Sequence, residues 1–218
     1  PYFDISFQHA SGPLLRTMRR FGDRESFLSL LDDVRRRVPN AGIRSNVIVG
    51  FPGETEADFE ETMRVVREAR FSSAFTFQYS IRPNTPAGVM TDQVPKEVVQ
   101  ERYERLVALV DDMSWQENQA QQGRTVEVMF AEGEGRKDNQ THRMTGRSRD
   151  NRLVHVGLGP HDEVPRPGDL AHVVITGAHP HHLTADHGGE VGHVAGHEGN
   201  HAGRGKRHQT RRGSGQNP

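Results

Sequence analysis

Residues 43–80 constrain the fold of this chain more than any other segment. The run Ile43–Phe51 is rich in β-branched residues and is bounded by glycine and proline, which is typical of a buried strand in a parallel sheet. A helix is expected to follow, with Thr55 as its N-cap residue, and then a second strand at Phe71–Ser80. Strands and helices repeating in units of roughly 30 residues predict an α/β fold with a parallel sheet.

The flanking segments first extend this pattern and then end it. A short strand is expected in residues 1–10, and apolar residues at three- and four-residue steps predict helices at 24–38 and 95–122. The period then changes to alternation, and short strands are predicted at 125–130, 153–156 and 170–175. Glycines and prolines separate these runs, as in a small antiparallel β-barrel.

The C-terminal segment differs in composition from the rest of the chain. From about His187 it has almost no apolar residues, which predicts a disordered tail. The predicted organisation is therefore an α/β domain with its connecting helix, a β-barrel and a tail, at residues 1–121, 122–186 and 187–218.

Composition excludes several classes of protein. The 218 residues include no cysteine, so this chain forms no disulfide, zinc finger or iron–sulfur ligation of its own. No run of about 18 apolar residues is present, and no secretory signal begins the chain, so we expect a cytoplasmic protein without a membrane partner. Thirteen histidines occur, eight of them from His179 onward, but their irregular spacing among glycines predicts no metal site.

Several segments together are similar to one enzyme family. SNVIVGFPGETEADFEET resembles the strand-to-helix segment of radical S-adenosylmethionine (SAM) methylthiotransferases. AFTFQYSIRPNTPA and DQVPKEVVQERYERL resemble the last barrel strand and the connecting helix of that family. GRTVEVMFAEGEGRK and HRMTGRSRDNRLVHV resemble its TRAM domain, an RNA-binding β-barrel. Over about residues 1–186, the resemblance implies the C-terminal part of a radical SAM βα (partial TIM) barrel followed by TRAM.

The sequence resembles both known branches of the family, each in a different segment. After about Glu54 the chain resembles the branch that methylthiolates an isopentenylated adenosine beside the tRNA anticodon. Before that point, YFDISFQHASG, MRRFGD and AGIRSNVIVGFPGET are more similar to the branch that methylthiolates an aspartate of a ribosomal protein. A recombined or misassembled coding sequence and a divergent natural enzyme both explain this change. Asn84 also stands where the family usually has glycine, so we expect that turn to be disturbed.

The resemblance implies SAM and two 4Fe-4S clusters as cofactors, and tRNA as the partner. The family's three-cysteine cluster motif is absent, and the chain begins without a methionine, as if cut from a longer protein. We therefore expect a chain that is inactive without the missing N-terminal half of the enzyme, and we assign it no catalytic residue. A ribosomal protein as substrate and an RNA-binding TRAM module without enzymatic activity are the alternatives.

The same resemblance places residues near SAM. Val47, Ile48, Gly50 and Pro52 lie on the strand and turn expected at the adenine, although sheet core is the commoner role for Val47. Three polar residues are further candidates, because strand ends commonly meet ligands and guanidinium binds carboxylate: Gln8, Ser11 and Arg19. Their alternatives are a local turn and a solvated helix face. For Glu54 and Glu56, helix capping is more plausible than catalysis.

A second group of candidates concerns RNA. Between Arg136 and Arg152 the sequence has six basic and two acidic residues, in a chain whose net charge is −1. Such clustering favours phosphate binding, although a soluble basic hairpin is the alternative. The RNA candidates are Arg147, Arg149, Asn151 and Arg152, together with the alternating aromatics Phe75, Phe77 and Tyr79. The aromatic residues could stack on a base, and sheet core is their commoner role.

Overall fold

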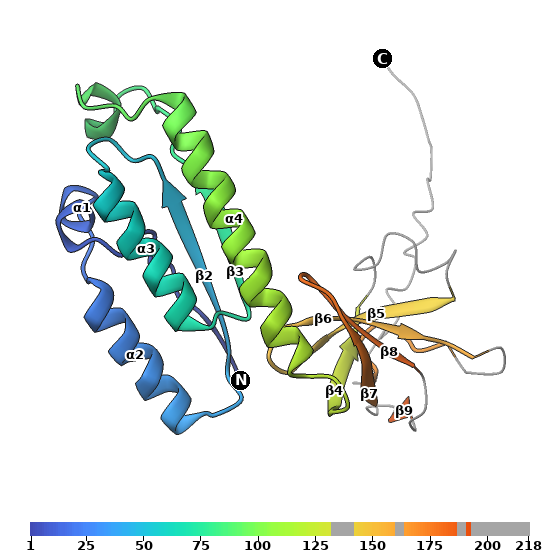
Figure 1. Cartoon of the computed structure of the whole chain (residues 1–218). Coiled ribbons are helices and arrows are strands. Elements are labelled where there is room, and N and C mark those ends of the chain that lie inside the picture. Colours follow the sequence, from blue (N-terminus) through green and yellow to red (C-terminus); the bar gives the residue numbers. More distant parts are fainter. Residues whose placement is uncertain (132–141, 160–163, 187–190, 193–218) are drawn as a thin grey trace, which may run out of the picture.

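A computed structural model describes residues 1–131, 142–159 and 164–186, and the backbone of 191–192. Two lobes are joined by one long helix, as Figure 1 shows. The first, here called the sheet lobe, comprises residues 1–119, and the second is a β-barrel within residues 125–186. The tail predicted for 187–218 lies outside the described residues, apart from the two-residue strand β9 (Val191–Gly192).

The sheet lobe is built on three parallel strands in the order β1-β2-β3. These strands are β1 (Tyr2–Asp4), β2 (Gly42–Val49) and β3 (Ser73–Gln78). The helices are α1 (Gly12–Thr17), α2 (Arg24–Arg37), α3 (Glu56–Ala69), α4 (Lys96–Gln119) and the short 3-10 helix η1 (Pro86–Val89). The α/β fold with a parallel sheet is therefore confirmed. The strand expected within residues 1–10 is shorter, because Gln8 has a φ of 71° and keeps only one bridge, to Val47.

Helix starts follow the local sequence. Thr55 caps α3 as predicted, and its side chain exchanges hydrogen bonds with Asp58 in a capping box. Asp23 and Ser26 form the same arrangement at the start of α2. In the turn before η1, Asn84 has a φ of 64°. Asparagine tolerates this left-handed conformation, so the turn forms although glycine is absent there.

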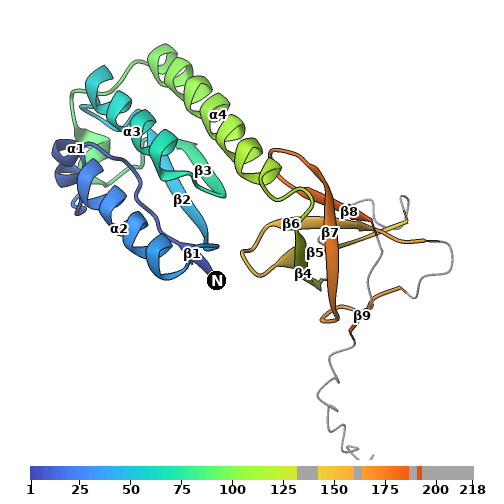
Figure 2. The ribbon, with the colours of Figure 1, turned by 60° about the horizontal axis from the view of Figure 1, so that its bottom comes forward.

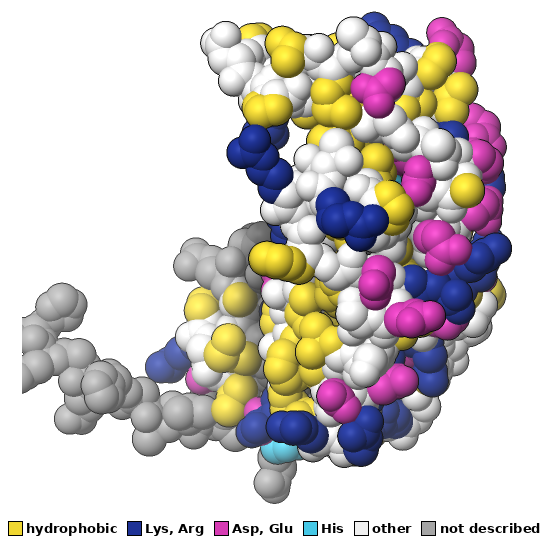
Figure 3. All heavy atoms as spheres, turned by 90° about the vertical axis from the view of Figure 1, so that its left-hand side faces the viewer, with side chains coloured by type: hydrophobic (Ala, Val, Ile, Leu, Met, Phe, Trp, Pro, Cys, Tyr) yellow, Lys and Arg dark blue, Asp and Glu magenta, His cyan; other side chains and the backbone are white. Residues whose placement is uncertain are grey.

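The two faces of the sheet differ. Along β2, every second side chain is buried under the helices, from Ile43 to Val49, and joins a core with Leu31 and Phe59. On the opposite face, Phe75 and Phe77 are 49% and 50% exposed. In Figure 3 the outline is hollowed on one side and hydrophobic side chains reach the surface near it, while charged side chains crowd the other side. The sheet is thus covered on one face only within the described residues.

Five strands close the barrel. They are β4 (Thr125–Phe130), β5 (Arg143–Ser148), β6 (Leu153–Gly157), β7 (Leu170–Ala178) and β8 (Leu183–Asp186). The order is β4-β5-β6-β8-β7, and β7 pairs back onto β4. The prediction of a purely antiparallel barrel is wrong at one pairing, because β6 and β8 run parallel. Inside, Val128, Phe130, Val154 and Ile175 are at most 1% exposed.

The barrel docks against the N-terminal end of the sheet, as the rotated view in Figure 2 shows. Gly42 at the start of β2 touches the β5–β6 turn so closely that an added Cβ would overlap the carbonyl oxygen of Asp150. Asn118 near the end of α4 is 3% exposed and donates to the carbonyl oxygen of His179 at 2.7 Å. Its own amide oxygen accepts from Arg152 Nε at 2.9 Å. These contacts hold the two lobes together. Among the described helices, none is both long and apolar enough to cross a membrane.

Candidate cofactor and RNA-binding sites

The loop between β2 and α3 is tightly fixed. Gly50 has a φ of 80°, and an added Cβ would lie 2.5 Å from Val99 of α4. Its backbone N–H donates to Glu54 Oε2 at 2.9 Å, and Pro52 beside it is buried. Close packing against α4, rather than approach of a ligand, is thus what the structure shows as the requirement for glycine at position 50.

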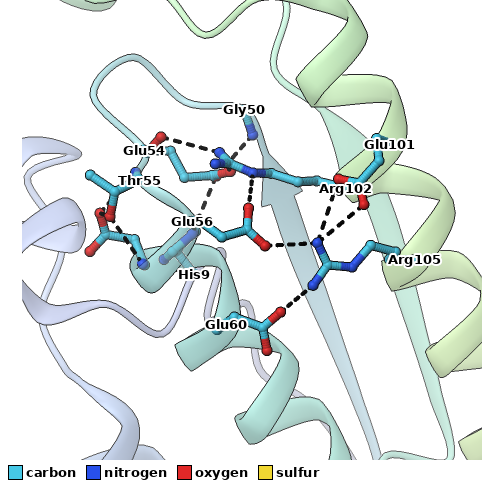
Figure 4. A network of polar contacts seen from close by, with 10 residues as sticks. His9, Gly50, Glu54, Thr55, Glu56, Glu60, Glu101, Arg102 and Arg105 are labelled. Carbon is cyan, nitrogen blue, oxygen red and sulfur yellow. Dashed lines mark hydrogen bonds and ion pairs between the residues drawn. The ribbon is translucent and has the colours of Figure 1, made fainter.

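A buried ion pair anchors this loop to α4 (Figure 4). The Glu54 side chain is fully buried, and its Oε1 accepts from Arg102 Nη1 at 2.8 Å. Arg102 also donates to the Glu54 carbonyl oxygen at 3.1 Å and, through Nε, to Glu56 at 3.0 Å. His9 Nε2 lies 3.4 Å from Glu54 Oε2, longer than a good hydrogen bond. The capping role expected for Glu54 is therefore wrong: its carboxylate ties the loop to α4.

Glu56 lies in the first turn of α3, where its negative charge suits the helix end. Arg105 donates to Glu56 at 2.7 Å and also pairs with Glu60 and Glu101, so one arginine of α4 joins three carboxylates. The hydrogen bond from Arg105 holds the pKa of Glu56 below its ordinary value. A carboxylate held ionised in this way is a poor general acid at neutral pH, so the site shows no sign of carboxylate catalysis.

The three polar SAM candidates from the N-terminal part of the chain have different partners and exposure in the structure. Ser11 is buried, caps α1 and donates to Asp58. Burial raises the pKa of Asp58, but the hydrogen bonds from Ser11 and Thr55 outweigh burial and the net shift is downward. Gln8 extends the sheet through backbone bonds to Asn46 and Ile48, both of 2.8 Å. Arg19 is exposed after α1 with a φ of 57°. For Ser11, the structure shows the local turn role.

The strand candidates divide by face. Val47 is 3% exposed and packs in the core beneath the helices, so its side chain does not reach the open face of the sheet. Val47, expected as a candidate contact of SAM, is therefore a core residue, the commoner role named for it above. Ile48 points the other way and is partly exposed, opposite Phe77 in the register of β2 and β3.

The three aromatic candidates for RNA also differ in surroundings. Phe75 and Phe77 share the open face, with ring centroids 6.5 Å apart. Tyr79 instead packs edge-on against Phe51, with ring centroids 5.3 Å apart. The expectation that these aromatics belong to the sheet core is wrong for Phe75 and Phe77, which are half exposed.

The basic candidates lie on and around the β5–β6 turn. The Arg152 side chain is 10% exposed and is bonded to Asn118 and Asp150, so it serves lobe docking. Arg149 is 75% exposed and pairs with Glu127 through two hydrogen bonds of 2.7 and 3.2 Å, which lower the pKa of that carboxyl. Arg147 Nη1 donates to the carbonyl oxygen of Asn151 at 3.1 Å. Arg152 thus has a structural role between the lobes, and its part in RNA binding stays a prediction.

Two clefts lie between the lobes. A cleft of about 510 Å³ includes Arg149, Arg124 and Arg35 among its lining residues. A second, of about 360 Å³, brings together four of the RNA candidates: Phe75, Arg147, Asn151 and Arg152. Sequence reasoning did not assign other residues of its lining to a binding site, among them Tyr2, Arg44, His181 and His182. The outward position of Arg44 on β2, between buried neighbours, was the signal that could have identified it.

Comparison with known proteins places the chain beside one group of enzymes. No family model matches it. It is 67% identical to the tRNA-2-methylthio-N(6)-dimethylallyladenosine synthase of Cutibacterium acnes over 86% of this chain and 38% of that protein. The synthases of Streptomyces coelicolor and Mycobacteroides abscessus are 58% and 57% identical, over 85% and 86% of this chain and 36% and 37% of theirs.

Among solved structures, the radical SAM enzyme coproporphyrinogen III oxidase of Escherichia coli aligns with a TM-score of 0.45 and 19% identity, covering 51% of this chain and 26% of that one. This likeness is too low to carry an argument. The chain spans little more than a third of the length of the curated relatives it matches, and over most of its own length it is similar to tRNA-2-methylthio-N(6)-dimethylallyladenosine synthases.

Proposed function

We propose that this chain is part of a cytoplasmic tRNA methylthiotransferase, which adds a methylthio group to an isopentenylated adenosine next to the anticodon by radical SAM chemistry. One observation carries the proposal: 67% identity, over 86% of the chain, to a synthase named for that product. On this proposal the sheet lobe is the C-terminal part of a partial TIM barrel, and the β-barrel is a TRAM domain.

The residues of this chain do not fit the iron–sulfur clusters of such an enzyme. The sequence has no cysteine, and the described residues contain no group of three or more side chains able to hold a metal ion. The clusters would be held by a part of the enzyme outside residues 1–218, consistent with relatives that are much longer than this chain. We expect the chain alone to be inactive.

The residues fit one wall of a SAM site. When bound, SAM supplies the radical chemistry in this proposal. Ile48 offers an apolar surface on the open face of the sheet, and the rigid Gly50–Pro52 turn lies where β2 ends, the usual ligand side of a parallel barrel. Because the Gly50 N–H already binds Glu54, the turn would act by shape rather than by donating a hydrogen bond.

Transplantation tests the proposal. The matching segment of the Cutibacterium acnes synthase is replaced by this chain, and the chimera is expressed in bacteria that lack their own synthase. Mass spectrometry of digested tRNA is expected to show the methylthiolated nucleoside. A matched chimera with Gly50→Val, which would strike Val99, is expected to show none. A folded chimera that binds SAM and modifies no tRNA would contradict the proposal.

The front of the chain motivates one alternative, a ribosomal protein aspartate methylthiotransferase, because residues 1–53 resemble that branch. The relatives above do not favour it. The same chimera distinguishes the two functions when ribosomal proteins from the expressing cells are also analysed by mass. A methylthiolated aspartate without modified tRNA would replace the proposed substrate.

RNA binding by the β-barrel is the part of the proposal that the isolated chain can test. Reversing Arg147 and Arg149 to glutamate is expected to weaken tRNA binding, because each lines one of the two clefts between the lobes, where a negative charge would repel phosphate. Filter binding at low salt measures the affinity. Unchanged affinity would remove these arginines from the interface.

A further inference from the structure

The loop between β3 and α4, residues 79–95, lies at the C-terminal edge of the parallel sheet. In Figure 1 it passes beyond the arrowhead of β2, at the end of the sheet lobe away from the barrel. The carbonyl oxygen of Asp92 in this loop accepts from the Gly53 N–H at 2.9 Å. The β3–α4 loop is therefore next to the Gly50–Pro52 turn, on the side where parallel barrels bind their ligands.

Internal hydrogen bonds fix the shape of this loop. The Thr85 hydroxyl donates to the carbonyl oxygen of Arg82 at 2.8 Å and accepts from the Gly88 N–H at 3.1 Å. Gln93 donates to two further carbonyl oxygens of the loop, both at 3.0 Å. A Cβ added to Gly88 would lie 2.5 Å from the Arg82 carbonyl oxygen, so the chain touches itself at these two residues. A loop fixed in this way loses little conformational freedom when a ligand binds.

Two apolar side chains are exposed beside this contact. Ile81 is 61% exposed and precedes Arg82, and Val89 is 78% exposed and follows Gly88. Because residues 82 and 88 touch, their neighbours 81 and 89 are held in the same small part of the surface. Single exposed apolar residues are common, but two of them on one rigid loop form a small apolar surface. An apolar group of a ligand that covered this surface would be removed from water, which favours binding.

Arg82 adds a positive charge to the same part of the loop. Its side chain is exposed, and within the described residues its guanidinium has no acidic partner. Asp92 is the only acidic residue in 79–95, and its carboxylate faces Gly53, where an added Cβ would lie 2.7 Å from Asp92 Oδ2. Guanidinium groups bind phosphate through two parallel hydrogen bonds. A ligand that fits this loop therefore carries a phosphate and an apolar group close together.

We propose that the β3–α4 loop recognises the isopentenyl group of the substrate nucleotide, with Ile81 and Val89 against this group and Arg82 at a phosphate of the RNA. The inference rests on the proposed function, in which the substrate is an isopentenylated adenosine of tRNA. The isopentenyl group is a branched hydrocarbon, so it gains from contact with apolar side chains, whereas an unmodified adenosine offers no such group. The loop thereby selects adenosines that already carry the substituent, and its contact with Gly53 sets them beside the expected SAM site.

Binding of two matched RNAs to the full chain tests this inference. Both are fluorescently labelled anticodon stem-loops of one sequence, and only one carries the isopentenyl group on its adenosine. Burial of a hydrocarbon group of this size is expected to make the modified RNA bind about tenfold more tightly. Ile81→Ser combined with Val89→Ser is expected to abolish this preference and to leave the affinity for the unmodified RNA unchanged. Arg82→Gln is expected to weaken both RNAs equally and to reduce the slope of log affinity against log salt by about one.

Two control variants lie on the outer helices of the sheet lobe, and neither residue lines a cleft between the lobes. Leu30→Ser replaces another exposed apolar side chain, on α2. Arg67→Gln removes another exposed positive charge, on α3. Both are expected to keep the preference for the modified RNA and to change neither affinity more than about twofold, because neither side chain contacts the β3–α4 loop in the structure.

Each outcome supports or overturns the inference. Equal affinity of the unaltered chain for the two RNAs overturns it, and so does a preference that survives in the Ile81→Ser, Val89→Ser variant or that Leu30→Ser also abolishes. Unchanged binding by Arg82→Gln removes the phosphate contact. In these cases the proposed function stands, because methylthiolation by the chimera tests it separately. If the folded chain, checked by circular dichroism, binds neither RNA, the inference falls together with RNA binding by this chain.

Discussion

Arg102 offers the sharpest test of what holds the sheet lobe together. Replacing Arg102 by methionine removes the partner of a carboxylate whose side chain is fully buried, at a pair distance of 2.8 Å. Glu54 would keep only the Gly50 N–H and the long contact with His9. Removing one member of a buried ion pair costs about 3–5 kcal/mol of unfolding free energy. We expect Arg102→Met to lose stability in that range.

The double variant and a neighbouring arginine complete the test. Glu54→Gln together with Arg102→Met leaves no unpaired charge, so most of the loss is expected to be recovered. Arg105→Met breaks pairs whose side chains are 35–56% exposed, and it is expected to cost less than about 1 kcal/mol. Urea unfolding followed by the fluorescence of Trp115, the single tryptophan, measures all three. If Arg102→Met and Arg105→Met cost the same, burial of the pair is not what stabilises this loop.

Three further predictions concern the lobes and their surfaces. Gly42→Ala is expected to displace the β5–β6 turn and speed tryptic cleavage at Arg124 between the lobes, whereas Gly157→Ala, whose added Cβ would meet its nearest atoms at 3.7 Å, should not change the rate. Because the pKa of His182 is lowered to about 4, the unfolded chain binds its proton first, so stability falls as pH drops from about 6.5 to about 4; urea midpoints across this range should flatten in His182→Phe. The uncovered sheet face and the open edge of β3 should make the isolated chain self-associate, and a single monomeric species in sedimentation at every concentration would refute this.

Sequence periodicity predicted the elements better than their surroundings. β2 and α3 were predictable because a β-branched run and a Thr-x-x-Asp capping box are local signals. Two barrel strands were missed: β5 carries Gly146 between polar residues, and β8 has only four residues. Neither gives an alternating run long enough to stand out.

The roles of single side chains were predicted less well, since their partners lie far along the chain. Glu54 and its partner Arg102 are 48 residues apart, and Arg152 is 34 residues from Asn118. A run of basic residues shows charge but not which charges are already paired. The aromatic residues of β3 are exposed because the described chain supplies no second layer over them, and no pattern within β3 contains that information.

Because the barrel docks at Gly42, strand β2 fixes the distance between the barrel and the opposite end of the sheet. β2 has eight residues, so it measures about 26 Å between the docked turn and the end where parallel strands usually meet their ligands. One stacked strand of nucleic acid advances about 3.4 Å per nucleotide, so that length corresponds to about eight nucleotides. In the proposed enzyme, an RNA bound both at the β5–β6 turn and at the C-terminal end of β2 would be selected by the length of its single-stranded loop as well as by its bases. Lengthening the loop would then misplace the reacting base even with every contact intact.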